Sequence, residues 1–164
     1  MKLKWETTNA GTAGMGPSPL LAYTVSLWLL TLLFFLRVLG QALVAFFHVT
    51  FLPPMAEWYS GLMPYPILLP TQGLILLLLV KACTDFSRGR GFFVVPRPRM
   101  GAFVRWFSYL YLIAMLVRYV VTMALHPERR WFGGTIPIVF HWVLAAWLFT
   151  FGHFHTRRMN GGGR

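Results

Sequence analysis

Acidic residues and cysteines are scarce in this chain of 164 residues. The only carboxylate side chains are those of Glu6, Glu57, Asp85 and Glu128, and the only cysteine is Cys83. A single cysteine excludes an internal disulfide and a Cys-x-x-Cys redox pair. Only 12% of the residues are charged, whereas a soluble domain has about 25%. We therefore expect an environment other than water around most of the chain.

Common catalytic motifs are also missing. The sequence has no Gly-x-Ser-x-Gly, no paired intramembrane Asp, no glycine-rich phosphate loop and no His-x-x-x-His or Glu-x-x-His metal motif. General acid–base chemistry would fall to His141, Glu57 or Tyr59. Nothing singles out one of the three, so the sequence defines no reaction.

Long apolar segments dominate the sequence, since 57% of the residues are hydrophobic. They cover residues 20–47, 67–82, 102–125 and 135–154. A bilayer core about 30 Å thick takes a helix of about 20 residues. The pattern predicts an all-α integral membrane protein, a bundle of four transmembrane helices within residues 20–155. Residues 1–19 form a polar N-terminal tail, and residues 156–164 read as a flexible C-terminal tail.

The basic residues predict the orientation. The net charge is +11, yet these residues lie beside apolar segments without an interleaved aromatic platform, which argues against nucleic acid. Four spans place the N-terminal tail, the second loop and the C-terminal tail on one side, with eleven Lys and Arg residues against two, Arg129 and Arg130, on the other. Because basic loops stay in the cytoplasm, we expect both termini there, in a multi-pass protein of the inner (plasma) membrane.

Polar side chains inside the apolar segments form the candidate site. Measured from the expected outer helix ends at 1.5 Å per residue, Arg37 lies about 16 Å deep, Gln41 and Gln72 about 10 Å, Arg118 about 12 Å and His141 about 9 Å. Each span thus contributes to one polar layer in the outer leaflet. Intramembrane charges usually face the bundle interior and mark function.

The two intramembrane arginines, Arg37 and Arg118, have no carboxylate inside the spans. An unpaired buried charge is costly, and three explanations are open. Glu57 or Glu128 folds down onto an arginine, the arginines reach lipid phosphates, or a ligand with acceptor oxygens completes the site. The proline- and aromatic-rich loop 51–66 is either a segment anchored at the membrane interface by Trp58 and Tyr59 or a cap that carries Glu57 inward.

Histidines offer a different ligand. His48, His126 and His141 all lie towards the expected outer side, on three different helices. Three such residues could hold haem b or a metal. A lone intramembrane histidine more often hydrogen-bonds a neighbouring helix, so both readings stay open.

The layout resembles the DoxX-like four-helix membrane proteins between about residues 36 and 126. The matching features are Arg37-x-x-Gly40, the segment Trp58-Tyr-Ser-Gly-Leu-Met-Pro-Tyr-Pro66, a basic glycine-containing turn after the second helix, and His126 after the third. The chain has Gln72 where such families often carry an acidic residue. Some of these proteins are membrane subunits of quinone-linked oxidoreductases, so the resemblance implies a quinone as ligand.

The expected function is that of a membrane subunit or accessory factor. Its polar outer-leaflet pocket would bind a quinone or a similar lipid-soluble ligand, and its partners would be the lipid bilayer and other membrane protein subunits. The first alternative is a b-type haem electron carrier. The second is a purely structural subunit of a larger membrane complex.

Overall fold

The computed structural model describes residues 19–54, 58, 64–125 and 135–157. Within them the chain forms four helices, α1 (Pro19–Phe47), α3 (Tyr65–Arg88), α4 (Pro98–Leu125) and α5 (Thr135–Arg157). All four are long and apolar enough to cross a membrane. The expectation of an all-helical chain with four such helices is confirmed.

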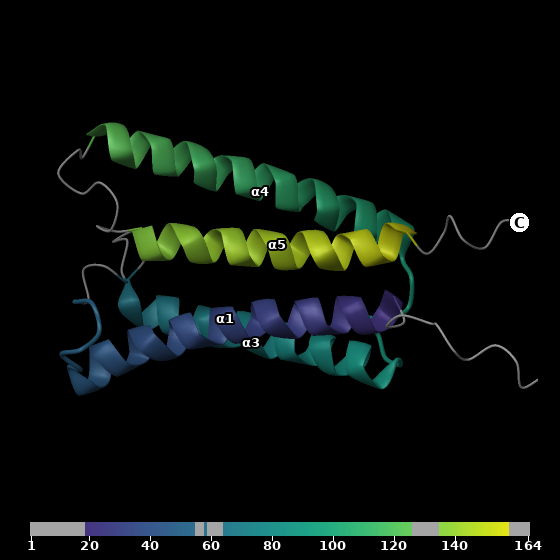
Figure 1. The fold of residues 1–164 in the computed structure, drawn as a ribbon, viewed down its shortest axis with the longest axis horizontal. Coiled ribbons are helices and arrows are strands. Elements are labelled where there is room, and N and C mark those ends of the chain that lie inside the picture. The colour runs from purple at the N-terminus through teal and green to yellow at the C-terminus, as the bar shows by residue number, and fades with distance from the viewer. Residues whose placement is uncertain (1–18, 55–57, 59–63, 126–134, 158–164) are drawn as a thin grey trace, which may run out of the picture.

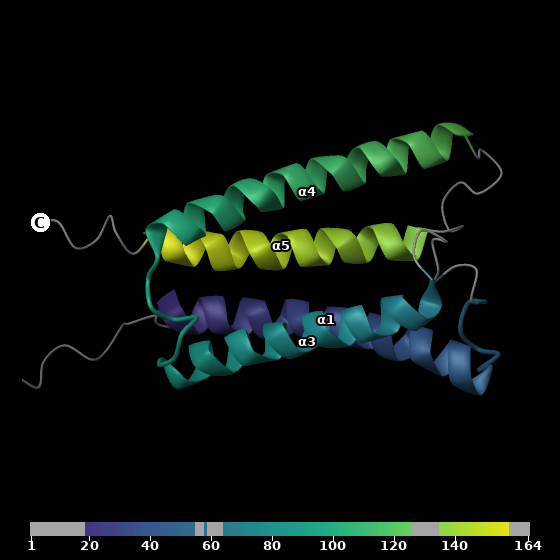
Figure 2. The same cartoon turned by 180° about the vertical axis from the view of Figure 1, so that it is seen from behind.

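The helices follow the spatial order α4, α5, α1, α3, which differs from their order in the chain (Figures 1 and 2). Helix α5 packs between α4 and α1, and α1 packs between α5 and α3. The beginning of α1 and the end of α5 lie at the same end of the bundle. We call this the basic end, because seven of the described basic residues lie on or beside the helix ends there: Lys81, Arg88, Arg90, Arg97, Arg99, Arg105 and Arg157.

Helices α4 and α5 cross closely at the basic end and diverge towards the opposite end (Figures 1 and 2). Two buried glycines permit this crossing. A Cβ atom on Gly152 would lie 2.8 Å from the main-chain nitrogen of Arg105, and one on Gly101 would lie 2.5 Å from the Cβ of His155. Small residues bring helix backbones together in the same way in membrane bundles.

The core joins α1, α3 and α5. It is built from aromatic and aliphatic side chains, chiefly Leu27, Phe34, Leu79, Phe86, Trp147, Phe151 and Phe154. A small polar group lies among them. The Trp147 indole N–H donates to Thr31 Oγ1 at 3.0 Å, and that hydroxyl lies 3.3 Å from the Cys83 thiol. Cys83 is fully buried, as a small residue that packs between helices.

Helix α3 is longer than its apolar segment predicts. It begins at Tyr65, so Pro70 lies beyond the first turn and removes one hydrogen bond from the helix. It ends at Arg88 instead of residue 82, because Lys81 pairs with Asp85 one turn further on and supports the polar last turn. Gly89 then closes the helix in the left-handed conformation, with φ of 61°.

The turn from α3 to α4 is folded onto the buried Asp85 carboxylate. Besides Lys81, this carboxylate accepts a hydrogen bond from the main-chain N–H of Phe93 at 3.3 Å. Gly91 has φ of 131° and lies directly against the carboxylate, so a side chain there would collide with it. Further along, the Arg97 main-chain N–H donates to Nδ1 of the fully buried His155. The basic turn is thus anchored to α3 and α5.

Candidate functional site

A pair of buried amides joins α1 to α3 in the half of the bundle away from the basic end. Gln41 is fully buried and Gln72 is 6% exposed. The Gln72 Nε2 donates to Gln41 Oε1 at 3.3 Å. The other two atoms of the pair, Gln41 Nε2 and Gln72 Oε1, have no partner among the described residues. A donor and an acceptor are therefore both left available at one place inside the bundle.

Arg37 lies one turn before Gln41 on the same face of α1, and it is 7% exposed. Its Nη2 donates to the main-chain carbonyl of Trp58 at 3.3 Å. The Trp58 indole N–H in turn donates to the carbonyl of Pro53 at 2.9 Å. A single residue of the loop after α1 thus supplies an acceptor for the buried guanidinium group.

Gly40 makes room for this arrangement. A Cβ atom at position 40 would lie 2.6 Å from Cη2 of Trp58, so the indole ring rests directly on the glycine. Trp58 is buried, with its indole against Gly40 of α1 and its carbonyl accepting from Arg37. The interfacial and the cap readings of the loop both stay predictions. Glu57 lies outside the described residues.

The remaining part of the polar layer lies between α4 and α5. The Tyr111 hydroxyl is 2.6 Å from Nδ1 of His141, and the two rings meet edge to face. Both Arg37 and Arg118 lie within electrostatic range of the His141 imidazole. Helix α5 packs between α4 and α1, so His141 lies on the middle helix, between the helix of Tyr111 and the helix of Arg37.

The sequence-predicted residues therefore do not all meet at one point. Gln41 and Gln72 join α1 to α3, and Arg37 contacts Trp58 in the loop after α1. His141 and Arg118 lie on the adjoining helices α5 and α4. Among the described residues, neither Gln41 nor Gln72 forms a hydrogen bond with His141 or Arg118. The layer is thus not a single hydrogen-bonded network.

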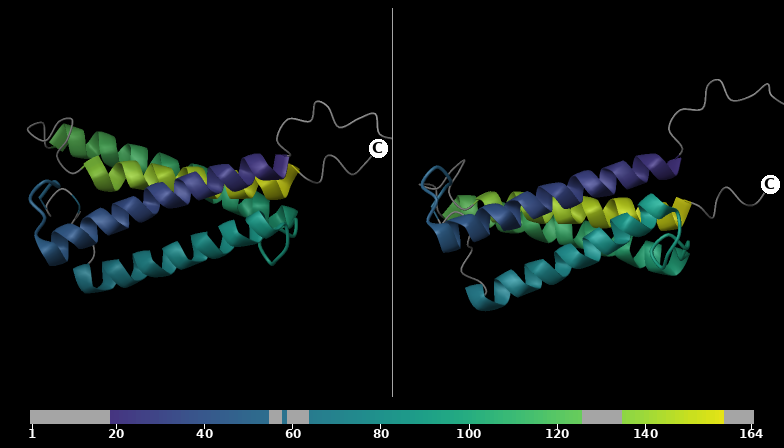
Figure 3. Two further views of the ribbon diagram at one scale, coloured as in Figure 1. Left: turned by 60° about the horizontal axis from the view of Figure 1, so that its bottom comes forward. Right: turned by 90° about the horizontal axis from the view of Figure 1, so that it is seen from below.

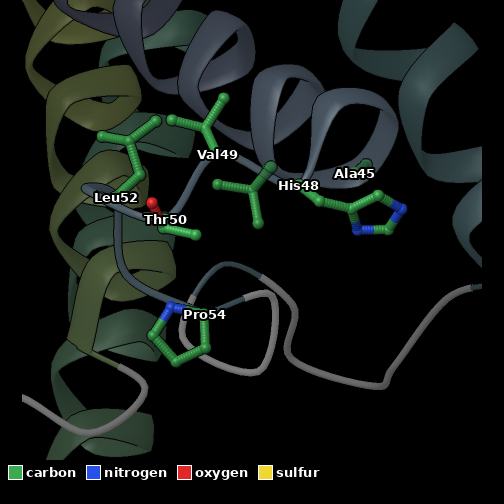
Figure 4. A pocket seen from close by; sticks show the side chains of 7 residues that line it. Ala45, His48, Val49, Thr50, Leu52 and Pro54 are labelled. Carbon is green, nitrogen blue, oxygen red and sulfur yellow. The ribbon is translucent and has the colours of Figure 1, made fainter.

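His48 does not continue the buried stripe of Arg37 and Gln41. It follows the last residue of α1, has φ of 49° and is exposed. It borders an open hollow of about 450 Å³ made by the end of α1 and the following loop. In Figure 4 its imidazole lies at the right and Leu52 at the left. His141 is engaged with Tyr111, and His126 lies outside the described residues. Among the described residues, no three His, Cys, Asp or Glu side chains are grouped as a metal site.

Sequence reasoning missed Tyr111 and the Trp58 carbonyl. A tyrosine within an apolar helix carries no sign of its partner, and a main-chain carbonyl carries no sequence signal at all. Gly40 was the available clue to Trp58, because a glycine inside a helix often permits a close approach.

Compared with models of protein families, with curated proteins and with solved structures, the chain matches none. The resemblance to DoxX-like proteins stays a sequence-based expectation.

Proposed function

We propose that this chain is a small multi-pass protein of the inner membrane, with both termini in the cytoplasm, acting as a membrane subunit or accessory factor. In the outer leaflet it holds a polar pocket for the head group of a quinone or a similar lipid-soluble ligand. The pocket residues are Arg37, Gln41 and Gln72, with His141 and Arg118 on the adjoining helices.

The unsatisfied amide pair is the main support for this proposal. Gln41 Nε2 and Gln72 Oε1 are buried without partners among the described residues, and such groups are rare and costly in a protein interior. A quinone carbonyl accepts from Gln41 Nε2, and a quinol hydroxyl donates to Gln72 Oε1. One ligand in its two forms therefore suits both atoms. The neighbouring Arg37 guanidinium adds positive potential that favours the partially negative carbonyl oxygens of a quinone.

The experiment is a titration of the purified protein in detergent with a water-soluble quinone that has no long tail. Gln41→Leu/Gln72→Leu should bind it at least about tenfold more weakly than the unmodified chain, a loss of about 1.4 kcal/mol. Thr71→Leu, at an exposed position beside Gln72, should bind as the unmodified chain does. Equal affinity of all three proteins would overturn the proposal.

A structural subunit is the second candidate, and the same contacts favour it. The Gln72–Gln41 bond ties α3 to α1, and the Trp147–Thr31–Cys83 group ties α5 to both. Under this reading the polar groups only hold helices together. The protein would then bind no quinone and would co-purify with a larger complex.

Haem b stays a sequence-based prediction, with His48, His126 and His141 as candidate ligands. A visible absorption spectrum of the purified protein tests it. A Soret band would support haem. Its absence would leave the quinone and structural readings.

A further inference from the structure

An apolar groove runs along the bundle between α3 and α5. Its volume is about 390 Å³, and its lining comes from α3, α5, α4 and the turn before α4. The lining residues are Ile75, Leu78, Leu79, Ala82, Phe93, Val104, Leu144, Trp147, Leu148 and Phe151. All of them are hydrophobic, so the groove offers no hydrogen bond from a side chain.

The groove exists because the backbones of α3 and α5 stay apart, although Phe86 of α3 contacts Phe151 and Phe154 of α5. Helix α1 packs against both, and α3 makes no close backbone approach to α5 or α4 along the described helices. The two views of Figure 3 show α3 inclined to α5 beside α1. Leu78 is 53% exposed while it lines the groove, so one wall reaches the molecular surface that faces lipid.

The lining of the groove stops about one helical turn from the polar site and includes neither Gln41, Gln72 nor His141. On α3, Gln72 precedes Ile75 by three residues and Leu79 by seven, a spacing that keeps all three on one helix face. On α5, His141 precedes Leu144 by three residues and Leu148 by seven, on one face as well. The apolar walls of both helices therefore begin one turn beyond a polar side chain of the candidate site. From there they continue for about 10 Å towards the basic end.

We infer that this groove holds the hydrocarbon tail of the same quinone-type ligand whose head group lies at Gln41 and Gln72. The ligand is then a prenyl- or alkyl-chain quinone that enters sideways from the lipid between α3 and α5. This inference rests on the proposed function, and it adds the chemical class of the tail and the route of entry.

The geometry of the site favours such a ligand over the acyl chain of a phospholipid. A phospholipid keeps its charged phosphate at the membrane surface. At its end away from the basic end, the groove lining instead stops about one turn from two neutral amides, Gln72 and its partner Gln41, which are almost fully buried. Neutral donor and acceptor atoms suit a neutral quinone or quinol head, which can lie at that depth. The same geometry leaves the tail pointing into the apolar groove.

Two variants of neighbouring residues test the tail position. Leu78→Trp places a large ring in the groove, whereas Leu77→Trp places it on the lipid-facing side, where Leu77 is 69% exposed and does not line the groove. Each protein is titrated with two quinones that share one head group, one with a decyl tail and one with none. Val104→Trp, on the α4 wall, replaces Leu78→Trp if that variant fails to fold.

The expected result is that Leu78→Trp lowers the affinity for the tailed quinone at least about tenfold and leaves the affinity for the tail-less quinone unchanged. Leu77→Trp should leave both unchanged. If Leu78→Trp binds the tailed quinone normally, the tail lies elsewhere, and the inference fails while the proposed function stands. If the unmodified protein binds neither quinone, the proposed function itself fails.

A photoreactive tail distinguishes the two sources of hydrocarbon. A quinone with a diazirine in its tail should label residues 75–82 and 144–151, and excess unlabelled quinone should abolish the labelling. A phosphatidylcholine with the same diazirine in its acyl chain should label these residues far less. Equal labelling by the two probes, insensitive to added quinone, would show an ordinary lipid-facing groove and overturn the inference.

Discussion

Gln41 and Gln72 stabilise the bundle only as a pair, because each is too deeply buried to use water. Gln41→Leu alone leaves the Gln72 Nε2 donor without its acceptor, and Gln72→Leu alone leaves the Gln41 Oε1 acceptor without its donor. A buried group left in this way costs about 1–3 kcal/mol. Leu at both positions removes all four polar atoms. We therefore expect the double variant to be more stable than either single variant by about 1–3 kcal/mol.

Unfolding titrations of the four proteins in mixed micelles measure these differences. Additive destabilisation, with the double variant the least stable, would mean that the two side chains do not share the hydrogen bond described here.

Arg37 should matter more for binding than for folding. Arg37→Leu removes the hydrogen bond to the Trp58 carbonyl, about 1 kcal/mol, but it also removes a buried charge, and Leu is favourable in a bilayer. We expect stability within about 1 kcal/mol of the original and quinone affinity lowered about tenfold. The measurements are an unfolding titration and a quinone titration, with Leu36→Ala at the exposed neighbour as control. Unchanged affinity would show that Arg37 takes no part in binding.

At the residue scale the sequence predicts which side chains are unusual but not what they touch. Arg37, Gln41 and Gln72 stand out because they interrupt apolar segments. The Gln41–Gln72 bond depends on how far α1 and α3 slide along each other, which no spacing within one helix determines. The sequence leaves two places open for Trp58, because a tryptophan near a helix end suits both the membrane interface and a buried cap.

For the helices, the sequence predicts where they lie better than where they end. Apolar segments predict where helices lie, since every described helix includes one. They underestimate helices that continue into polar sequence, as α3 does from residue 82 to Arg88 through the Lys81–Asp85 pair. The spatial order of the helices was not predictable, because it depends on which faces pack. The close α4–α5 crossing depends on two glycines whose partners lie about 50 residues away.

Glycine substitutions test that crossing. Gly152→Ala would press a methyl group against the α4 backbone near Gly101 and Arg105, and overpacking costs about 1–3 kcal/mol. Gly73→Ala is the control, because nothing lies within 4 Å of a Cβ atom at that position. It should be neutral or stabilise α3 by up to about 1 kcal/mol, through the higher helix propensity of alanine. Unfolding titrations compare them, and equal effects of the two substitutions would contradict the close packing at Gly152.

The whole molecule has one strongly basic end, and this asymmetry underlies the proposed orientation. Reporter fusions after Arg99 and after Arg164 should show cytoplasmic activity, because both follow basic segments. A reporter inserted within residues 57–61 should show activity outside the cytoplasm. The reverse result at any of the three positions would contradict the four-span arrangement or its orientation.

In the proposed function, the buried amide pair receives a lipid-soluble quinone. Solvent extraction of the purified protein, followed by chromatography of the extracted lipids, measures this quinone, with Gln41→Leu/Gln72→Leu purified in parallel. We predict close to one quinone per protein from the unmodified chain. The double variant should retain clearly less, about half if its affinity falls tenfold and the quinone concentration is about tenfold above the original Kd. Equal amounts of quinone from both proteins would mean that the amide pair does not hold it, and would overturn the proposal.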